Sequence, residues 1–121
     1  MAAAAAGARR AGGISLGVLP GSDAGEGSAN LTLALPTGLA EMRNTLIVRA
    51  ARAVIAIGGG YGTLSEIAFA LRLGKPVIAM RSWEIRRSGS DHADQGIRVA
   101  GSAQEAAEWA LHEARRAQAR G

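Results

Sequence analysis

The sequence predicts an α/β fold in which helices cover a parallel sheet. Short apolar runs alternate along the chain with segments that favour helix. Strands that are buried on both faces consist of continuous apolar runs, and their alternation with helices is typical of a parallel sheet. The clearest runs are residues 14–19, 53–57 and 75–80. A chain of 121 residues forms at most one domain, which we expect to span residues 1–121.

The first part of the chain is expected to form helix, strand, loop and helix. Gly12 and Gly13 follow an alanine-rich segment and should end its helix as a glycine cap. Thr37 follows Pro36 and is the expected N-cap of the next helix. In order, the expected elements are a helix over 1–11, a strand over 14–19, a polar loop over 22–30, an extended piece over 31–35 and a helix from 37 to about 52.

The second part repeats the alternation of strand and helix. Gly74 should close one helix, and Ser102 with Glu105 forms a capping box that opens the last one, whose apolar side carries Ala106, Trp109 and Ala110. The expected elements are a strand over 53–57, a glycine-rich loop over 58–62, a helix over 63–73, strands over 75–80 and 97–100 with a polar loop over 81–95 between them, and a helix from 102.

The glycine-rich loop is the strongest candidate for a binding site. It joins a buried strand to a helix start, where unpaired N–H groups and the helix dipole attract phosphate, and Thr63 can add a hydroxyl. Glycine also lets a ligand approach the backbone closely. A tight turn without a ligand is the alternative, because the loop fits neither the P-loop nor the dinucleotide motif. The candidate phosphate-binding glycines are Gly58, Gly59, Gly60 and Gly62.

Other loops should project from the same sheet edge. In parallel sheets, ligands bind beyond the carboxyl ends of the strands. The chain leaves its expected strands at Pro20-Gly21, at 58–62 and at Arg81-Ser82-Trp83. We therefore expect the glycine-rich loop to have these segments as neighbours.

Arg43 is the most unusual residue of the helix expected from Thr37. A helical wheel places it in the middle of an apolar face, where an arginine needs an anionic partner or a polar cavity. A side chain that snorkels to solvent is the alternative. Asn44, the next residue, can hydrogen-bond a ligand or face solvent. The remaining members of the apolar face are Leu39, Leu46, Ile47 and Ala50.

Glu66 has two compatible interpretations. With Thr63 it fits a capping box, in which the carboxylate bonds the backbone at the helix start. It also lies about one turn from the expected phosphate site, where a carboxylate can act as acid, base or acceptor for a ribose hydroxyl.

Composition narrows the possible partners. The chain has no cysteine, which excludes disulfides and thiolate metal sites, and fits a cytoplasmic location. No apolar run approaches the roughly 20 residues of a membrane span. The net charge of +4 suggests a nucleic-acid-associated module as one hypothesis. Against it, the basic residues are scattered, and aromatic residues, on which bases would stack, make up only 3% of the chain. His92 lies with Asp91 and Asp94 in the polar loop, and three such ligands can hold a metal ion; we favour a solvated loop instead and expect no metal site. His112 is expected on a helix surface.

Arg43-Asn44, the strand 53–57 and the segment 59–66 together resemble a known superfamily. The "lonely guy" (LOG) proteins, often called lysine decarboxylase-like, carry the motif P-G-G-x-G-T-x-x-E. Here Gly58 replaces the proline, while the three motif glycines, Thr63 and Glu66 match. The catalytic arginine of the family lies fifteen residues before that proline, which is the position of Arg43. The glycine in place of proline is closest to the branch of the molybdenum-cofactor carrier proteins.

The resemblance implies a Rossmann-like doubly wound parallel sheet that binds a small phosphorylated ligand. In the phosphoribohydrolase branch, the arginine and glutamate cleave the N-glycosidic bond of a nucleoside 5'-monophosphate, giving the base and ribose 5-phosphate, with no cofactor required. The implied catalytic residues are Arg43 and Glu66. The alternative is a non-catalytic carrier that binds molybdenum cofactor, a phosphorylated pterin, as its ligand. A homodimer is implied in either case.

One departure from the family concerns the start of the chain. Members of the family have a strand, a helix and a second strand before the helix that matches residues 1–11, and their first strand is central in the sheet. We therefore expect this chain to be an incomplete domain. A sheet that lacks its central strand has unpaired backbone N–H and C=O groups, so we expect the chain to be unstable alone. A cooperative thermal unfolding transition of the 121-residue chain would refute this expectation.

Overall fold

The strands and helices belong to two units of the chain. The computed structural model describes residues 1–120, and its units are residues 1–47 and residues 48 onward. Each unit contains parallel strands, as the apolar runs predict. That residues 1–121 make a single domain stays a prediction. Along the described residues, no helix is both long enough and apolar enough to cross a membrane.

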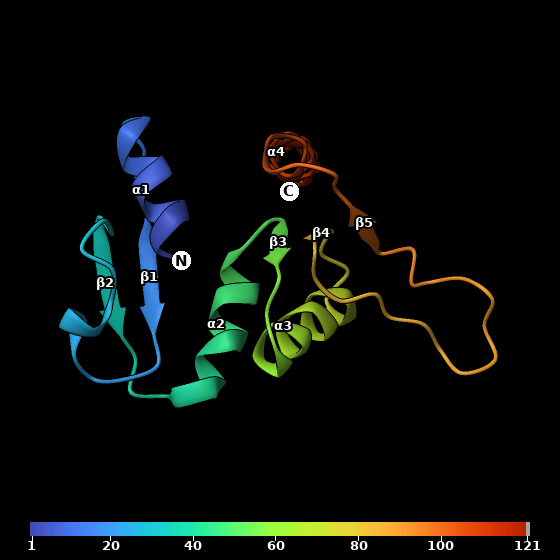
Figure 1. Ribbon diagram of the computed structural model, residues 1–121, viewed down its shortest axis with the longest axis horizontal. Helices are drawn as coiled ribbons and strands as arrows, with labels where there is room; N and C mark the ends of the chain where they lie inside the picture. Colours follow the sequence, from blue (N-terminus) through green and yellow to red (C-terminus); the bar gives the residue numbers. More distant parts are fainter. Residues whose placement is uncertain (121) are drawn as a thin grey trace. The chain divides into compact units, whose positions relative to one another are not determined.

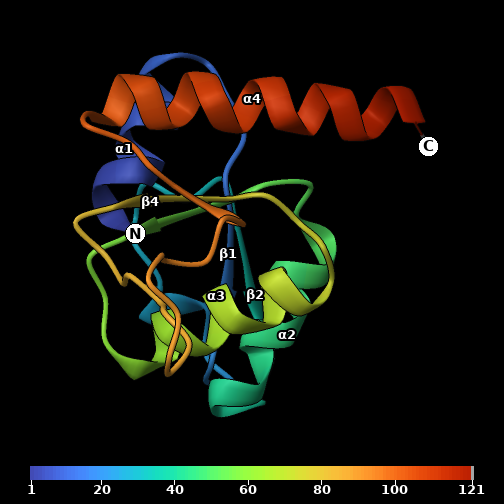
Figure 2. The same cartoon turned by 90° about the vertical axis from the view of Figure 1, so that its right-hand side faces the viewer.

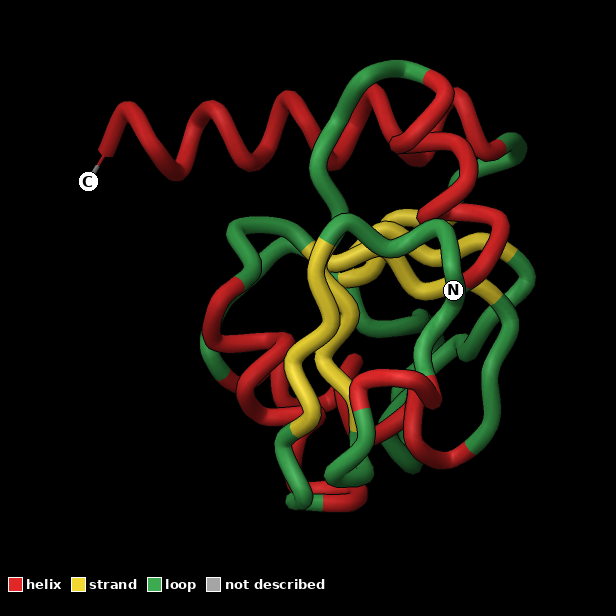
Figure 3. The backbone as a smooth tube through the Cα atoms, turned by 90° about the vertical axis from the view of Figure 1, so that its left-hand side faces the viewer, coloured by secondary structure: helices red, strands yellow, loops and turns green. Residues whose placement is uncertain are grey.

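The first unit contains two parallel strands that pair with each other. The helix α1 (Ala2–Arg10) precedes the strand β1 (Leu16–Leu19), and the strand β2 (Leu33–Pro36) pairs with β1 in the register Leu16↔Leu33. The two strands run side by side in Figure 3. Their connection contains only a short 3₁₀ helix, Ala24–Glu26. The strand expected over 14–19 and the extended piece over 31–35 are therefore confirmed, with small shifts of their ends.

Glycine ends α1 as predicted. Gly12 has a φ of +75°, a left-handed conformation that residues other than glycine rarely adopt. The turn lets the Gly12 N–H donate to the Arg9 carbonyl and the Gly13 N–H donate to the Ala8 carbonyl at 2.7 Å. These bonds satisfy carbonyls that the helix leaves unpaired at its end.

The next helix begins later than predicted, so Thr37 is not its N-cap. The Thr37 hydroxyl donates to the Leu19 carbonyl at 2.6 Å and accepts from the Leu39 N–H, which ties it to the end of β1. Positive φ angles at Gly38 and Ala40 break the helical path. A 3₁₀ turn (Ala40–Met42) follows, and α2 spans Arg43–Ala50.

The later start also corrects the helical wheel. Leu39 and Leu46, expected on the buried face, are 44% and 41% exposed. The buried residues of α2 are Asn44 and Val48, which are four residues apart and thus on one face.

The second unit is a three-stranded parallel sheet with a helix on each face. Its strand order is β3-β4-β5, and α3 and α4 contact β3 and β4 from opposite sides (Figures 1 and 2). Coverage of both faces, which the apolar runs predict, is complete only at the central strand, where Val77, Ile78 and Ala79 are buried. On the flanking strands, Ile55, Ile57 and Val99 are exposed. The elements are β3 (Val54–Ile57), α3 (Tyr61–Arg72), β4 (Val77–Met80), β5 (Ile97–Val99) and α4 (Ala103–Arg120).

Alternate residues of β4 pack under different helices. On one face, Val77 belongs to a cluster that α3 completes. On the other face, Ile78 packs with Ala106 and Trp109 of α4, the apolar side expected from the sequence. Full burial of a side chain of this size contributes about 1.5–3 kcal/mol. The buried members of the first cluster are Val48, Ala56, Ile67, Ala70 and Val77.

One predicted capping box is present and the other is not. The Ser102 hydroxyl accepts from the Glu105 N–H at 3.1 Å, and the Glu105 carboxylate accepts from the Gly101 N–H. By contrast, the N-cap of α3 is Gly60, which has no side chain to cap with. Thr63 is the third residue of that helix, so a capping box that starts at Thr63 is wrong.

Lys75 holds the end of α2 by three hydrogen bonds. Its ammonium donates to the carbonyls of Val48, Arg49 and Ala51 at 2.6–2.8 Å. A cation at a helix C-terminus satisfies unpaired carbonyls and opposes the helix dipole. The Lys75 side chain is half-buried, so its loss would leave these acceptors poorly solvated.

We expect Lys75→Met to lower the free energy of unfolding by about 1.5–3 kcal/mol, the range for hydrogen bonds to a charged group. Urea denaturation measures this. Arg87→Met is the control, because it removes the same charge from an exposed loop residue. Equal stability of the two variants would contradict a capping role for Lys75.

Candidate functional site

The glycine-rich loop lies at the carboxyl end of β3, as predicted. Gly58 and Gly59 have φ angles of +55° and +90°, so the backbone turns left-handed directly after the strand. A Cβ at Gly59 would overlap the Thr63 side chain, whereas a Cβ at Gly58 or Gly60 would meet open space. Glycine at position 59 is therefore required both by the backbone angle and by the close approach to α3.

The loop after β4 holds the glycine-rich loop in place. The Ser82 hydroxyl donates to the Gly58 carbonyl at 2.7 Å, and the indole Nε1–H of Trp83 donates to the Gly60 carbonyl at 3.0 Å. The Gly58 N–H donates to the Met80 carbonyl. Carbonyls on both sides of Gly59 are thus fixed by groups from the neighbouring strand's loop, as expected from segments that leave the same edge of the sheet.

Several N–H groups of the loop and helix start remain available to a ligand. Within the described part of the chain, the amides of Gly59, Gly60, Tyr61 and Thr63 have no hydrogen-bond acceptor. They lie at the positive end of the α3 dipole. Converging free amides at a helix start form a cradle for an anion such as phosphate.

Thr63 and Glu66 occupy one side of α3 near this cradle. Both are half-buried and lie three residues apart, so their side chains are neighbours on the helix. They flank the buried stripe formed by Ile67 and Ala70. Side chains of a helix tilt toward its N-terminus, which directs this pair toward the glycine end of α3.

Arg43 and Asn44 lie at the start of α2, in the first unit. The Arg43 guanidinium donates through Nη1 to the Val18 carbonyl at 3.2 Å, while its Nε is buried and has no hydrogen-bond partner among the described residues. Asn44 is 8% exposed and has interactions of its own. A buried cationic donor without an acceptor favours an anionic ligand over a surface role. That Arg43 and Asn44 share one site with the glycine-rich loop and Glu66 of the second unit stays a prediction.

Tyr61 and three residues of the loop after β4 complete the surroundings of the glycine-rich loop. The Tyr61 ring stacks on Trp83, with centroids 5.8 Å apart and planes 26° apart. Ser82 and Trp83 carry the hydrogen bonds described above. Arg81 has a φ of +51°, and such strain in a residue other than glycine often marks a functional site. The position of the segment Arg81-Ser82-Trp83 at this edge was predictable; the contacts of its side chains were not.

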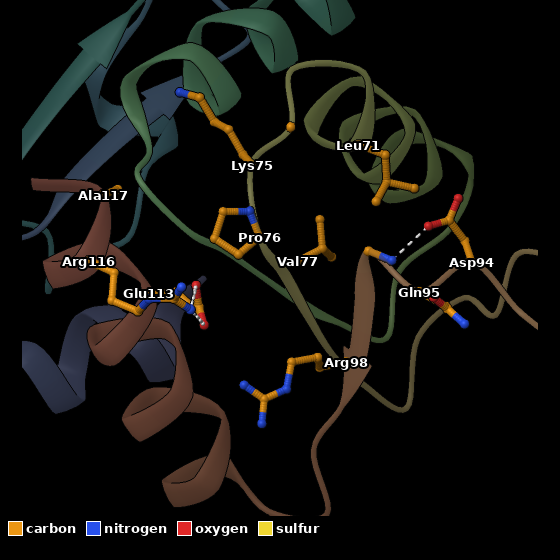
Figure 4. A pocket seen from close by; sticks show the side chains of 12 residues that line it. Leu71, Lys75, Pro76, Val77, Asp94, Gln95, Arg98, Glu113, Arg116 and Ala117 are labelled. Atoms are coloured by element: carbon orange, nitrogen blue, oxygen red, sulfur yellow. Dashed lines mark hydrogen bonds and ion pairs between the residues drawn. The ribbon is translucent and has the colours of Figure 1, made fainter. Parts of the chain in front are cut away.

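One cavity of the second unit lies at the opposite edge of the sheet from the glycine-rich loop. It has a volume of about 430 Å³ and lies where β4 and β5 begin (Figure 4). Its charged groups already have partners: Glu113 pairs with Arg116, Asp94 accepts from the Gly96 N–H, and Arg98 lies over the Trp109 ring at 4.0 Å. The Lys75 ammonium is occupied at α2. This cavity therefore offers few polar groups to a ligand.

The polar loop after Trp83 shows local hydrogen bonds. His92 Nδ1 lies 3.2 Å from the Ala93 carbonyl, and both His92 and Asp91 are exposed. Across the described residues, no three side chains of His, Asp or Glu are grouped closely enough to hold a metal ion.

Comparisons with known proteins agree with this architecture. A model of the SLOG cluster4 family matches residues 1–109. An uncharacterized protein of Archaeoglobus fulgidus is 42% identical over 82 residues, covering 67% of this chain and 53% of the relative. The chain thus spans about half the length of the curated relative that it matches.

Two solved structures are similar to this chain over most of its length. The molybdenum cofactor binding protein of the phototrophic bacterium Rippkaea orientalis has a TM-score of 0.77 and 31% identity, over 93% of this chain and 69% of its own. The X-ray structure of TM1055 has a TM-score of 0.68 and 33% identity, over 89% of this chain and 69% of its own. These matches confirm the α/β, Rossmann-like fold class and support an SLOG, Rossmann-like superfamily, while the finer LOG assignment stays a prediction. Because the family model spans residues 1–109, the chain belongs to the SLOG cluster4 family.

Proposed function

We propose that this chain binds a small phosphorylated ligand in its glycine-rich loop. The observation that carries the proposal is the set of free amides at Gly59, Gly60, Tyr61 and Thr63, at the start of α3. The carbonyls of the loop are held by Ser82 and Trp83, so binding requires little reorganisation of the loop. A phosphate here would accept hydrogen bonds from preorganised donors, which is favourable because the ordering cost is already met.

We propose further that the ligand is a nucleoside 5'-monophosphate and that the chain hydrolyses it. Water adds to C1' of the ribose, the C1'–N bond breaks, and the base leaves with a proton, so the products are free base and ribose 5-phosphate. Glu66 acts on the attacking water or on a ribose hydroxyl. Arg43 stabilises negative charge that develops on the ligand. The resemblance to the phosphoribohydrolases supports both roles, and Asn44 would add a hydrogen bond.

The test is incubation of the chain with AMP and other nucleoside monophosphates. We expect equal amounts of free base and ribose 5-phosphate, measured by chromatography. Calorimetry on the same sample measures the binding of AMP, so that binding of the ligand is tested separately from its hydrolysis. Absence of AMP binding would overturn this function, whereas binding without products would overturn only the hydrolysis.

Carriage of molybdenum cofactor is the second candidate function. It is favoured by the similarity to the molybdenum cofactor binding protein of Rippkaea orientalis, with a TM-score of 0.77. The cofactor is a phosphorylated pterin, so its phosphate suits the same amides. This function requires binding without turnover. Molybdenum that co-purifies with the chain and is lost in Gly59→Ala would support it, and a metal-free chain that cleaves AMP would exclude it.

We also propose that the chain forms a homodimer, as the resemblance implies, and that it is located in the cytoplasm, which its lack of cysteine fits. One face of the β1–β2 pair exposes large apolar side chains, which at an interface would be covered. Light scattering on the purified chain should give twice the monomer mass of 12.3 kDa. A mass equal to that of the monomer at micromolar concentration would contradict the dimer. The exposed side chains are Leu16, Leu33 and Leu35.

A further inference from the structure

The aromatic pair Tyr61–Trp83 lies directly beside the proposed phosphate cradle. We propose that this pair is the platform on which the planar heteroaromatic ring of the ligand stacks. The inference rests on the proposed function, because it assumes that the glycine-rich loop holds the phosphate of the same molecule. It assigns the ring-binding part of the site to Tyr61 and Trp83, which the family motif does not specify.

The exposure of Tyr61 is the first observation. Tyr61 is 82% exposed although it lies at the start of α3, beside a loop that Ser82 and Trp83 hold by hydrogen bonds. Tyrosine buries a large area when it is covered, so an open ring at a binding loop offers contact surface to a partner. The Tyr61 ring stacks on Trp83 with planes 26° apart, and the exposed fraction shows that most of the residue stays accessible despite this contact.

The rigidity of Trp83 is the second observation. Its indole donates to the Gly60 carbonyl at 3.0 Å, and its half-buried ring packs against the core cluster under α3. Ser82, the preceding residue, is bonded to Gly58. The platform is therefore fixed to the same two glycines whose loop forms the phosphate cradle, and its position relative to the cradle is set before a ligand binds.

The spacing along the chain is the third observation. The N–H of Tyr61 is one of the free amides, and its ring belongs to the same residue. A ligand whose phosphate and ring are joined by a short linker can contact both groups at once. Nucleoside monophosphates and phosphorylated pterins share this chemistry. Stacking tolerates many ring types because each planar ring has a π face.

The experiment compares AMP with ribose 5-phosphate, which has the phosphate and the sugar but no ring. Calorimetric titration should show that AMP binds about 5- to 150-fold more tightly, the range for stacking of one base. Tyr61→Leu, which keeps bulk but loses the aromatic face, should remove most of this preference and leave ribose 5-phosphate binding unchanged. Tyr61→Phe should retain the preference.

A second measurement reports on Trp83 itself. In Trp109→Phe, Trp83 is the only remaining tryptophan, so its fluorescence should be quenched by AMP and not by ribose 5-phosphate. If AMP and ribose 5-phosphate bind equally and Tyr61→Leu changes neither, the platform is wrong while the phosphate site stands. If neither compound binds, the proposed function itself fails. A loss of stability in Tyr61→Leu with an unchanged preference would assign the pair a structural role and overturn the inference.

Discussion

Replacing Glu66 with glutamine should lower the rate of AMP hydrolysis by about 10²- to 10⁴-fold, the usual contribution of a general acid or base. Glutamine has nearly the same shape and can still hydrogen-bond, but it cannot take up a proton from water. The half-buried position of Glu66 on α3 favours a specific role over a solvated surface charge. Because the proposed phosphate contacts use backbone amides, the affinity for AMP should change only a few-fold.

The control for this variant is Glu108→Gln. Glu108 is an exposed carboxylate on α4 and should give wild-type rates. Steady-state kinetics on both variants, with thermal unfolding to check the fold, measures the effect. An unchanged rate of AMP hydrolysis in Glu66→Gln would show that the Glu66 carboxylate neither takes up nor donates a proton in the reaction. A lower affinity with an unchanged rate would instead assign Glu66 to binding.

Local patterns were sufficient to predict the elements around the glycine-rich loop. A continuous apolar run gives β3, glycines follow it directly, and α3 covers a face that is apolar at helical spacing. Each of these signals lies within a few residues of the structure that it determines. The same holds for Ser102 and Glu105, whose capping bonds join residues close in sequence. Such local signals are the most reliable for elements with a strong apolar period.

The start of α2 was not predictable because distant contacts determine it. Thr37 looks like a helix N-cap, but its hydroxyl bonds the Leu19 carbonyl, eighteen residues earlier. A helical wheel that begins at Thr37 therefore identified the wrong buried face. It nevertheless singled out Arg43, whose buried Nε shows that the residue is not an ordinary surface arginine. The family motif leads to the same residue by an independent route.

The contribution of Trp83 was missed for a related reason. Its hydrogen bond to Gly60 joins residues that are 23 positions apart, and no local pattern marks it. Only the topology of parallel strands, which brings successive loops to one sheet edge, placed it near the site. The fold class therefore predicts which segments meet, while the identity of the contacts depends on side chains that the sequence alone does not place.

Gly59→Ala should both destabilise the chain and abolish phosphate binding. A left-handed backbone costs about 1–2 kcal/mol for a residue with a Cβ, and overlap in a packed region adds about 1–3 kcal/mol. Here both apply, since Gly59 has a φ of +90° and its Cβ would overlap the Thr63 side chain. We expect a loss of about 2–5 kcal/mol in urea denaturation and an affinity for ribose 5-phosphate too weak to measure, because the shifted loop no longer converges its amides.

The neighbouring glycines separate these two causes. Gly58 shares the positive φ but has open space around its Cβ, so Gly58→Ala should show only the backbone term. Gly60 has a φ of −101° and open space, so Gly60→Ala should unfold like the wild type. In a Thr63→Ala background, Gly59→Ala should cost about 1 kcal/mol less, because part of the overlapping side chain is gone. Equal stability of the three alanine variants would mean that the loop relaxes freely, and a loop of that kind would not be a preorganised phosphate site.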